Sequence, residues 1–180
     1  MTRAADTSTM RLTLLALLLP ACAGSDPDRA ELEPEQSEHV VTYHLDPRAE
    51  CAPADGDWEA VGAAFSAWQA FGVVVLESES PAQGSVAVCI RAGEFWGWRY
   101  GATSNADGWR MDLRADIDQP GSHRVLWSIA AHEMLHVVLA TNEHSPERGL
   151  TAIRVCPDCA GFTDDDVAWV ESFGLAYDRR

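Results

Sequence analysis

The stretch that decides the fold is "SHRVLWSIAAHEMLHVVLATNEHSPERG", residues 122–149. Residues 122–141 carry apolar side chains in nearly every direction around a helical wheel, so they predict a long, buried helix. His132, Glu133 and His136 interrupt this apolar surface. Because unpaired polar groups are costly to bury, the three residues indicate a shared ligand. The stretch therefore predicts a metal site within the core.

The spacing of these residues suits zinc chemistry. Residues four apart lie one turn apart on the same helix face, so His132 and His136 can offer two imidazole nitrogens to one ion. Zinc accepts nitrogen ligands in tetrahedral geometry. Glu133 is rotated by about 100° from His132 around the helix, so it can reach a water molecule at the ion without being a ligand. A carboxylate in that place can act as a general base.

A catalytic zinc ion needs a third protein ligand. The candidates are Asn142, Glu143, His144 and, farther along the chain, Asp158. Asn is a poor zinc ligand, and Glu143 lies where the helix must already be ending. A helix that ends near residues 140–142 lets the chain bend back and brings His144 to the metal. We therefore expect His144 to be the third ligand, with Glu143 as the alternative.

The N-terminus has the pattern of an export signal. "MRLTLLALLLPAC", residues 10–22, has one arginine and then an apolar run that is too short to span a bilayer. Met10 can serve as the true start, because residues 1–9 add nothing that a signal requires. "LPAC" is similar to a bacterial lipobox, which implies cleavage before Cys22 and lipid attachment to its sulfur. An ordinary signal peptide with a chance cysteine is the alternative.

The segment after Cys22 is predicted to be a solvated tether. It is acidic, contains Ser and Pro, and has almost nothing apolar, so it cannot bury enough surface to fold. We expect a signal peptide at 1–21, a lipidated cysteine with its tether at 22–39, and one folded domain at 40–180. The chain would then be an exported lipoprotein of the cell envelope, periplasmic or at the cell surface, anchored to a membrane by its lipid.

The composition limits the partners. The formal net charge is −15, whereas a nucleic-acid-binding protein normally carries a basic face. A hydrophobic content of 47% and seven tryptophans favour a packed core, and we expect a monomer. Asp112, Asp116 and Asp118 are candidate calcium ligands, but their spacing fits no defined calcium loop.

Four cysteines remain if Cys22 carries lipid. They are Cys51, Cys89, Cys156 and Cys159. An even number in an exported protein predicts two disulfides, and sequence alone allows three pairings. We expect Cys51–Cys89 and Cys156–Cys159. The "CPDC" motif is interpreted as a local structural disulfide. A zinc knuckle would need a second pair of cysteines at similar spacing, and a thioredoxin-like site would need a helix that starts at the motif.

Periodicity predicts the other elements. We expect strands at 40–47, 72–80, 84–94, 96–100 and 109–114, and further helices at 55–72 and 163–177. Thr163 and the three aspartates after it form an N-cap with negative charge at the positive end of the helix dipole. Val167, Val170 and Phe173 are expected to face inward.

Residues 130–150, "AAHEMLHVVLATNEHSPERGL", resemble the matrixin-like branch of the metzincin zinc metalloproteases. The family pattern is His-Glu-x-x-His-x-x-Gly-x-x-His, often followed by Ser and a turn, and "EHSPERGL" is similar if two residues are inserted. The resemblance is looser over residues 40–177, where the helices at 55–72 and 163–177 are similar to the family's early and closing helices. It implies an α+β fold: a twisted, mostly parallel sheet with an early helix, a buried metal-binding helix and a C-terminal helix.

The resemblance also implies roles for individual residues. His132, His136 and His144 become zinc ligands, and Glu133 becomes the general base. An extended peptide substrate would pair with an edge strand, for which we expect residues 109–114.

Two positions depart from the family pattern. Leu139 stands where the family has a glycine that permits a sharp turn, which fits a turn placed two residues later. No methionine follows Met134, so the family's methionine beneath the metal is absent, and Thr151 or a neighbour stands in its place.

Three functions follow as alternatives. We expect a zinc metalloendopeptidase that hydrolyses peptides or proteins. A non-catalytic binding lipoprotein with a zincin fold is the second reading, favoured by the missing glycine and methionine. A structural envelope protein without metal, in which the histidines are satisfied core residues, is the third.

Overall fold

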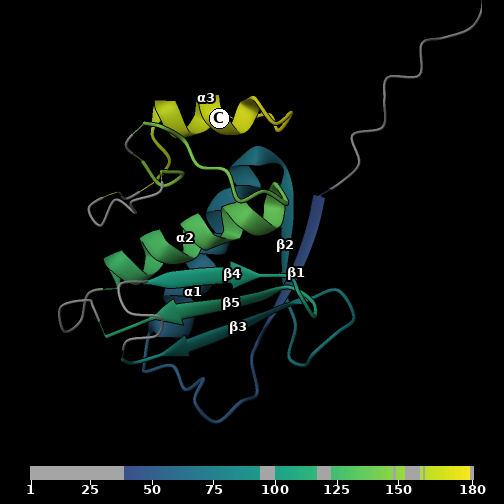
Figure 1. The fold of residues 1–180 in the computed structure, drawn as a ribbon, viewed down its shortest axis with the longest axis vertical. Coiled ribbons are helices and arrows are strands. Elements are labelled where there is room, and N and C mark those ends of the chain that lie inside the picture. Colours follow the sequence, from purple (N-terminus) through teal and green to yellow (C-terminus); the bar gives the residue numbers. More distant parts are fainter. Residues whose placement is uncertain are drawn as a thin grey trace, which may run out of the picture. The chain divides into compact units, whose positions relative to one another are not determined.

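The computed structural model describes residues 39–93, 100–116, 123–147, 149–152, 159 and 161–178. These residues belong to one compact unit, 36–180. Within them the fold is α+β, as expected: a mixed, mostly parallel five-stranded sheet packs with three α-helices (Figure 1). The expected signal peptide, Cys22 and nearly all of the tether lie outside the described residues. No helix in the described ranges has the length and apolarity that a membrane span requires.

The sheet has the strand order β2-β1-β3-β5-β4. Its strands are β1 His39–Leu45, β2 Val73–Glu77, β3 Val86–Arg91, β4 Gly101–Ser104 and β5 Arg110–Arg114. Neighbouring strands run parallel, except that β4 pairs antiparallel with β5. The expectation that 109–114 forms the edge is wrong, because β5 lies between β3 and β4. The edge strands of the described sheet are β2 and β4. The one next to β5 is β4, whose sequence "GATS" is too short to show alternation. Most of the expected strand at 96–100 lies outside the described residues.

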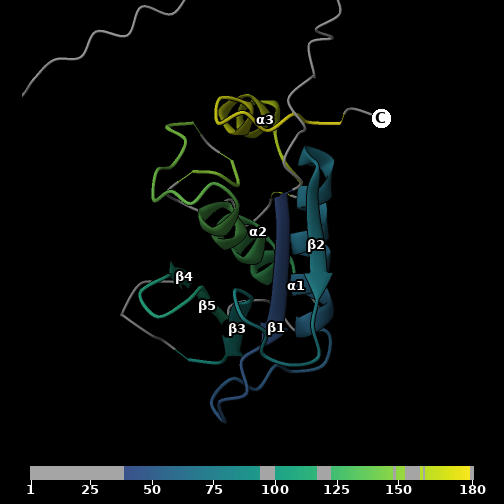
Figure 2. The ribbon, with the colours of Figure 1, turned by 90° about the vertical axis from the view of Figure 1, so that its right-hand side faces the viewer.

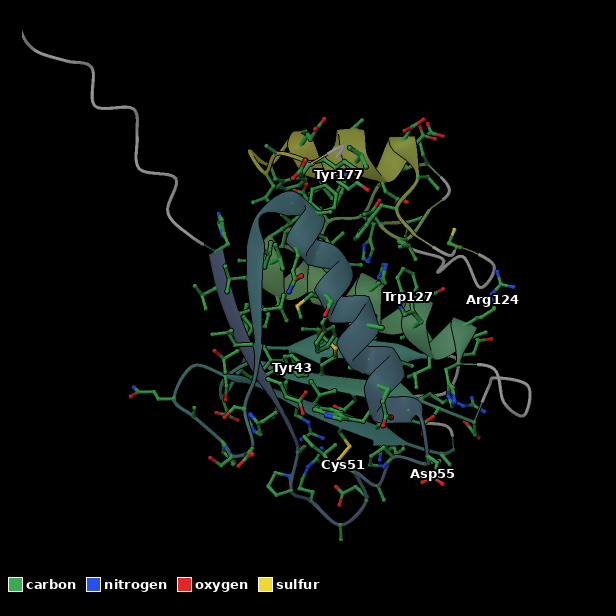
Figure 3. The ribbon with its side chains drawn as sticks, turned by 180° about the vertical axis from the view of Figure 1, so that it is seen from behind. Tyr43, Cys51, Asp55, Arg124, Trp127 and Tyr177 are labelled. Carbon is green, nitrogen blue, oxygen red and sulfur yellow. A yellow bond between two sulfur atoms is a disulfide. The ribbon has the colours of Figure 1, made fainter. Side chains whose placement is uncertain are left out.

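One face of the sheet carries both long helices. The register places Tyr43 of β1, Met111 of β5 and Thr103 of β4 on the same face, because Cα partners point their side chains to the same side. Tyr43 packs edge-on against Phe65 of α1 (Asp57–Ser66), with 4.8 Å between ring centroids. Thr103 contacts Glu133 of α2 (Arg124–Val138). Figures 2 and 3 show these helices against the sheet, with Tyr43 beside α1.

The predicted early helix is confirmed. After α1 the chain tightens into a 3₁₀ turn, Ala67–Phe71, and stops at Gly72, which has a left-handed φ of 75°. Trp68 is fully buried, and its Nε1 donates a hydrogen bond to the Ala131 carbonyl of α2 at 3.0 Å. The aromatic residues of this helix therefore belong to the core that supports α2.

The closing helix, α3, is shorter than predicted: it spans Asp164–Glu171. Thr163 caps it as expected and forms a capping box with Asp166. Val167 and Val170 are buried, but Phe173 is 40% exposed, so its predicted inward position is wrong. The reason is that the helix ends before Phe173, and its periodicity does not extend that far.

The predicted Cys51–Cys89 disulfide is confirmed, and it ties the segment after β1 to β3. Cys159 is also disulfide-bonded. Its expected partner, Cys156, lies outside the described residues, so that pairing stays a prediction.

Two of the three candidate calcium ligands, Asp112 and Asp116, pair with arginines. Asp112 pairs with Arg110 at 2.9 Å and Arg48 at 3.5 Å, and Asp116 pairs with Arg114. Their charges are therefore balanced by side chains, and Asp118 lies outside the described residues.

Candidate metal centre

The centre is built on α2, which is buried along most of its length. His132 and Glu133 are only 4% and 6% exposed, and His136, one turn after His132, is half-buried. The helix places both histidines on one face, as their spacing predicts. Its core side chains pack on the sheet, which makes it a rigid base for the two rings.

The chain reverses at Ala140. The helix ends at Val138, and Leu139 still donates its N–H to the Leu135 carbonyl at 2.9 Å. Ala140 then adopts a left-handed φ of 47°, a conformation that costs a non-glycine residue about 1 kcal/mol. The expectation that the helix continues to residues 140–142 is therefore wrong. The helix ends close to the position at which the family pattern has its turn. The two residues by which the spacing from His136 to His144 exceeds that pattern therefore lie in the loop after the helix.

This loop brings His144 back to the other two histidines. One ligand atom from each of His132, His136 and His144 can be chosen so that all three atoms lie within 4.8 Å of one another. Ring centroids are 5.2 Å apart for His132–His136, 5.1 Å for His132–His144 and 4.9 Å for His136–His144. Among the described residues, this is the set of His, Cys, Asp or Glu side chains whose geometry could hold a metal ion.

Backbone carbonyls orient two of the rings. His132 Nδ1 lies 2.6 Å from the Leu150 carbonyl and His136 Nδ1 lies 2.8 Å from the Thr141 carbonyl. Because a carbonyl only accepts hydrogen bonds, each Nδ1 carries the proton and each Nε2 keeps its lone pair. Metal-binding histidines commonly have this arrangement, in which the second nitrogen donates to a carbonyl or carboxylate. Three neutral imidazoles form a donor set that fits zinc.

The environment keeps the imidazoles of His132 and His144 neutral. Burial, with smaller contributions from the neighbouring His136 and His144, lowers the pKa of His132 to about 4, against the opposing effect of the Leu150 carbonyl. Burial, followed by the charge of His136, also lowers the pKa of His144. Since metal ligands must be deprotonated, both rings are ready to bind an ion at neutral pH.

The pKa of His132 predicts how stability depends on pH. Without metal, the unfolded chain takes up a proton on this histidine near pH 6.5, whereas the folded chain does so only near pH 4. Stability is therefore lost as the pH falls through this window, and His132 accounts for about 2 kcal/mol of loss at pH 5. Urea unfolding of the zinc-free protein at pH 7 and pH 5 measures the loss. The same measurement on His132→Gln should show a smaller dependence on pH; an equal dependence would contradict the assignment.

Asp166 of α3 anchors the loop that holds His132. Its carboxylate accepts hydrogen bonds from the N–H groups of Leu150 at 3.1 Å and Thr151 at 2.8 Å, and from the Thr151 hydroxyl at 2.6 Å. It also accepts from the N–H and hydroxyl of Thr163. Burial alone would raise the pKa of Asp166, but these hydrogen bonds outweigh it and hold the pKa below 3.8. The carbonyl that orients His132 therefore belongs to a loop fixed by a buried carboxylate.

Gly149 permits this close approach. A Cβ atom on this residue would overlap the Asp166 carboxylate. Sequence reasoning predicted Asp166 only as part of a helix N-terminus, and it missed Gly149. The capping box was readable, but the contact with residues 150 and 151 depends on how two distant segments pack.

Replacing Asp166 with asparagine should destabilise the domain by about 3 kcal/mol, because a buried network loses its charged acceptor. Zinc affinity should fall about tenfold, because the Leu150 carbonyl is no longer fixed. Asp165→Asn is the matched control: Asp165 lies in the same first helical turn but is exposed. Chemical unfolding and zinc titration measure the two effects. Equal losses in both variants would show that only charge at the helix terminus matters.

The other candidate ligands do not join the centre. Asn142 and Glu143 are exposed, and Glu143 is absent from the cluster that the histidines form. Asp158 lies outside the described residues. Thr151, near the place where the family has its methionine, is fully buried and bonded to Asp166.

The chain matches no protein-family model and no curated protein sequence.

Proposed function

We propose that the chain is a zinc-dependent endopeptidase with a zincin-type centre. The observation that carries the proposal is the convergence of His132, His136 and His144, two of them with Nδ1 bonded to a backbone carbonyl, directly beside a buried Glu133. Three histidines and a neighbouring carboxylate are the groups that metal-assisted hydrolysis needs. A structural protein would have no evident need for three converging imidazoles.

Each group of residues in the proposed centre has a distinct role. A zinc ion held by the three histidines would act as a Lewis acid that polarises the scissile carbonyl and lowers the pKa of a water molecule. Glu133 accepts the proton of the attacking water and later delivers it to the leaving amine. Leu150 and Thr141 keep the histidine rings oriented through their carbonyls. The loop from Ala140 to His144 completes the ligand set.

The edge strand supplies a place for the substrate. Glu133 lies against β4, and β4 pairs with β5 on one side only within the described sheet. An extended peptide can add to such an edge through backbone hydrogen bonds. We therefore propose a peptide or protein substrate bound along β4, in place of the strand at 109–114 that the sequence suggested.

We propose that this domain lies outside the cell. The N-terminal pattern at 10–22 supports export and lipid attachment at Cys22, and the Cys51–Cys89 disulfide fits an oxidising compartment. The sheet with its metal-binding helix and closing helix agrees with the zincin-like fold that the motif implies. We propose a monomeric lipoprotein of the cell envelope.

Peptide hydrolysis tests the proposed function. The purified chain is mixed with a library of quenched fluorescent peptides, with one equivalent of zinc or after metal removal by a chelator. Cleavage is expected only with zinc, and it should return when zinc is added back. A chain that binds one zinc ion but cleaves no peptide would support the binding lipoprotein instead. A chain that binds no zinc would support the structural alternative.

A further inference from the structure

Glu133 lies between α2 and two residues of the edge strand. Gly101 and Thr103 are two positions apart on β4, so both face α2. A Cβ atom on Gly101 would lie 2.8 Å from Glu133 Oε1 and 2.9 Å from its Cγ. The nearest atom to this Cβ would be Ile129 Cγ2, at 2.5 Å, so the absent side chain at Gly101 makes room for both the Ile129 side chain and the Glu133 carboxylate.

Thr103 holds the other side of this carboxylate. Its Oγ1 lies 2.8 Å from Glu133 Oε2 and 3.3 Å from the Glu133 backbone oxygen. A hydroxyl has one proton, and the closer, charged acceptor forms the stronger hydrogen bond. The hydroxyl therefore donates mainly to Oε2, which leaves Oε1 on the side of Gly101.

This bond fixes a side chain that would otherwise have several rotamers. Glu133 is 6% exposed, and its carboxylate needs hydrogen bonds to offset its burial. Catalytic groups act efficiently only when packing and hydrogen bonds hold them in the productive geometry. A threonine on the strand proposed to bind substrate meets this need directly.

We infer that Thr103 is the positioning residue of the general base: its hydroxyl holds the Glu133 carboxylate, on the helix that carries His132 and His136, against strand β4. The inference rests on the proposed function. It assigns Thr103 no contact with zinc or substrate, because its side chain faces α2 while a peptide would pair with the backbone edge of β4.

Two substitutions separate the hydroxyl from the size of the side chain. Thr103→Val keeps the shape and removes the donor, whereas Thr103→Ser keeps the donor. With the best-cleaved peptide of the quenched library, Thr103→Val should lower kcat about tenfold or more and change KM less than twofold. Thr103→Ser should stay within about threefold of the parent kcat. Thr42→Val, the same change at a half-buried position of strand β1, is the matched control and should leave kcat unchanged.

A measurement without catalysis tests the contact itself. In zinc-free protein, the Tm losses of Thr103→Val, Glu133→Ala and the double variant are compared. The double variant should lose about 2–4 °C less than the sum of the single losses, because either substitution already removes the shared bond.

The outcomes distinguish this inference from the proposed function. Additive Tm losses overturn the contact, even in an active enzyme. A Thr103→Val variant with the parent kcat, or a Thr103→Ser variant as impaired as Thr103→Val, overturns the positioning role. A parent chain that cleaves no peptide overturns the proposed function and with it any catalytic role of Thr103, whatever the Tm values show.

Discussion

Replacement of Glu133 by glutamine is expected to lower peptide hydrolysis about 10³-fold while zinc stays bound. Glutamine has nearly the same shape and can still accept a hydrogen bond from Thr103, but its amide cannot take a proton from water. His132 and His136 do not depend on the Glu133 charge for their orientation, since their Nδ1 partners are the Leu150 and Thr141 carbonyls. The loss should therefore appear in kcat, and zinc content should remain one ion per chain.

Glu59→Gln is the matched control for this variant. Glu59 is an exposed glutamate on α1, so Glu59→Gln removes the same charge at a position far from Glu133 in the sequence. It should hydrolyse peptide like the parent. If Glu133→Gln also keeps the parent rate, the hydrolysis uses a different base and the assigned role of Glu133 is wrong.

Replacement of His144 by alanine is expected to weaken zinc binding about 10²- to 10³-fold. Structural zinc sites bind with roughly 10–16 kcal/mol, so one ligand of such a set contributes a few kcal/mol, and each 1.4 kcal/mol is a factor of ten. His144 is half-buried, so its removal should disturb folding little. Titration of zinc into the zinc-free variant, in competition with a chelator of known affinity, measures the loss.

Two further variants make the His144 result specific. His39→Ala removes an exposed histidine at the start of β1 and should bind zinc like the parent. Glu143→Ala tests the alternative third ligand and should also bind like the parent, because Glu143 lies outside the histidine cluster. Parent-like zinc affinity in His144→Ala, with a loss in Glu143→Ala, would reverse the ligand assignment.

The metal helix was predictable from the sequence because its signal is local. The apolar surface of α2 and the four-residue spacing of His132 and His136 depend only on helix geometry. Convergence of His144 was also predicted, but for a partly wrong reason. The helix does not extend to residues 140–142; it ends at Val138, and a left-handed alanine makes the turn.

The residues that support the site were not predictable in the same way. Strand β4 has four small or polar residues, so no periodicity identified it as the edge. Asp166 reaches residues 150 and 151, and Thr103 reaches Glu133 across 30 positions of sequence. Such contacts depend on the packing of distant segments, and residue types alone do not show them.

The most direct test of the central claim is X-ray absorption at the zinc edge, on the purified chain loaded with one equivalent of zinc and dialysed. The proposed centre predicts one retained zinc ion with nitrogen neighbours at about 2.0–2.1 Å and the outer scattering of histidine rings. Loss of the zinc on dialysis, or a sulfur shell at about 2.3 Å that places the ion on cysteines, would contradict the three-histidine centre.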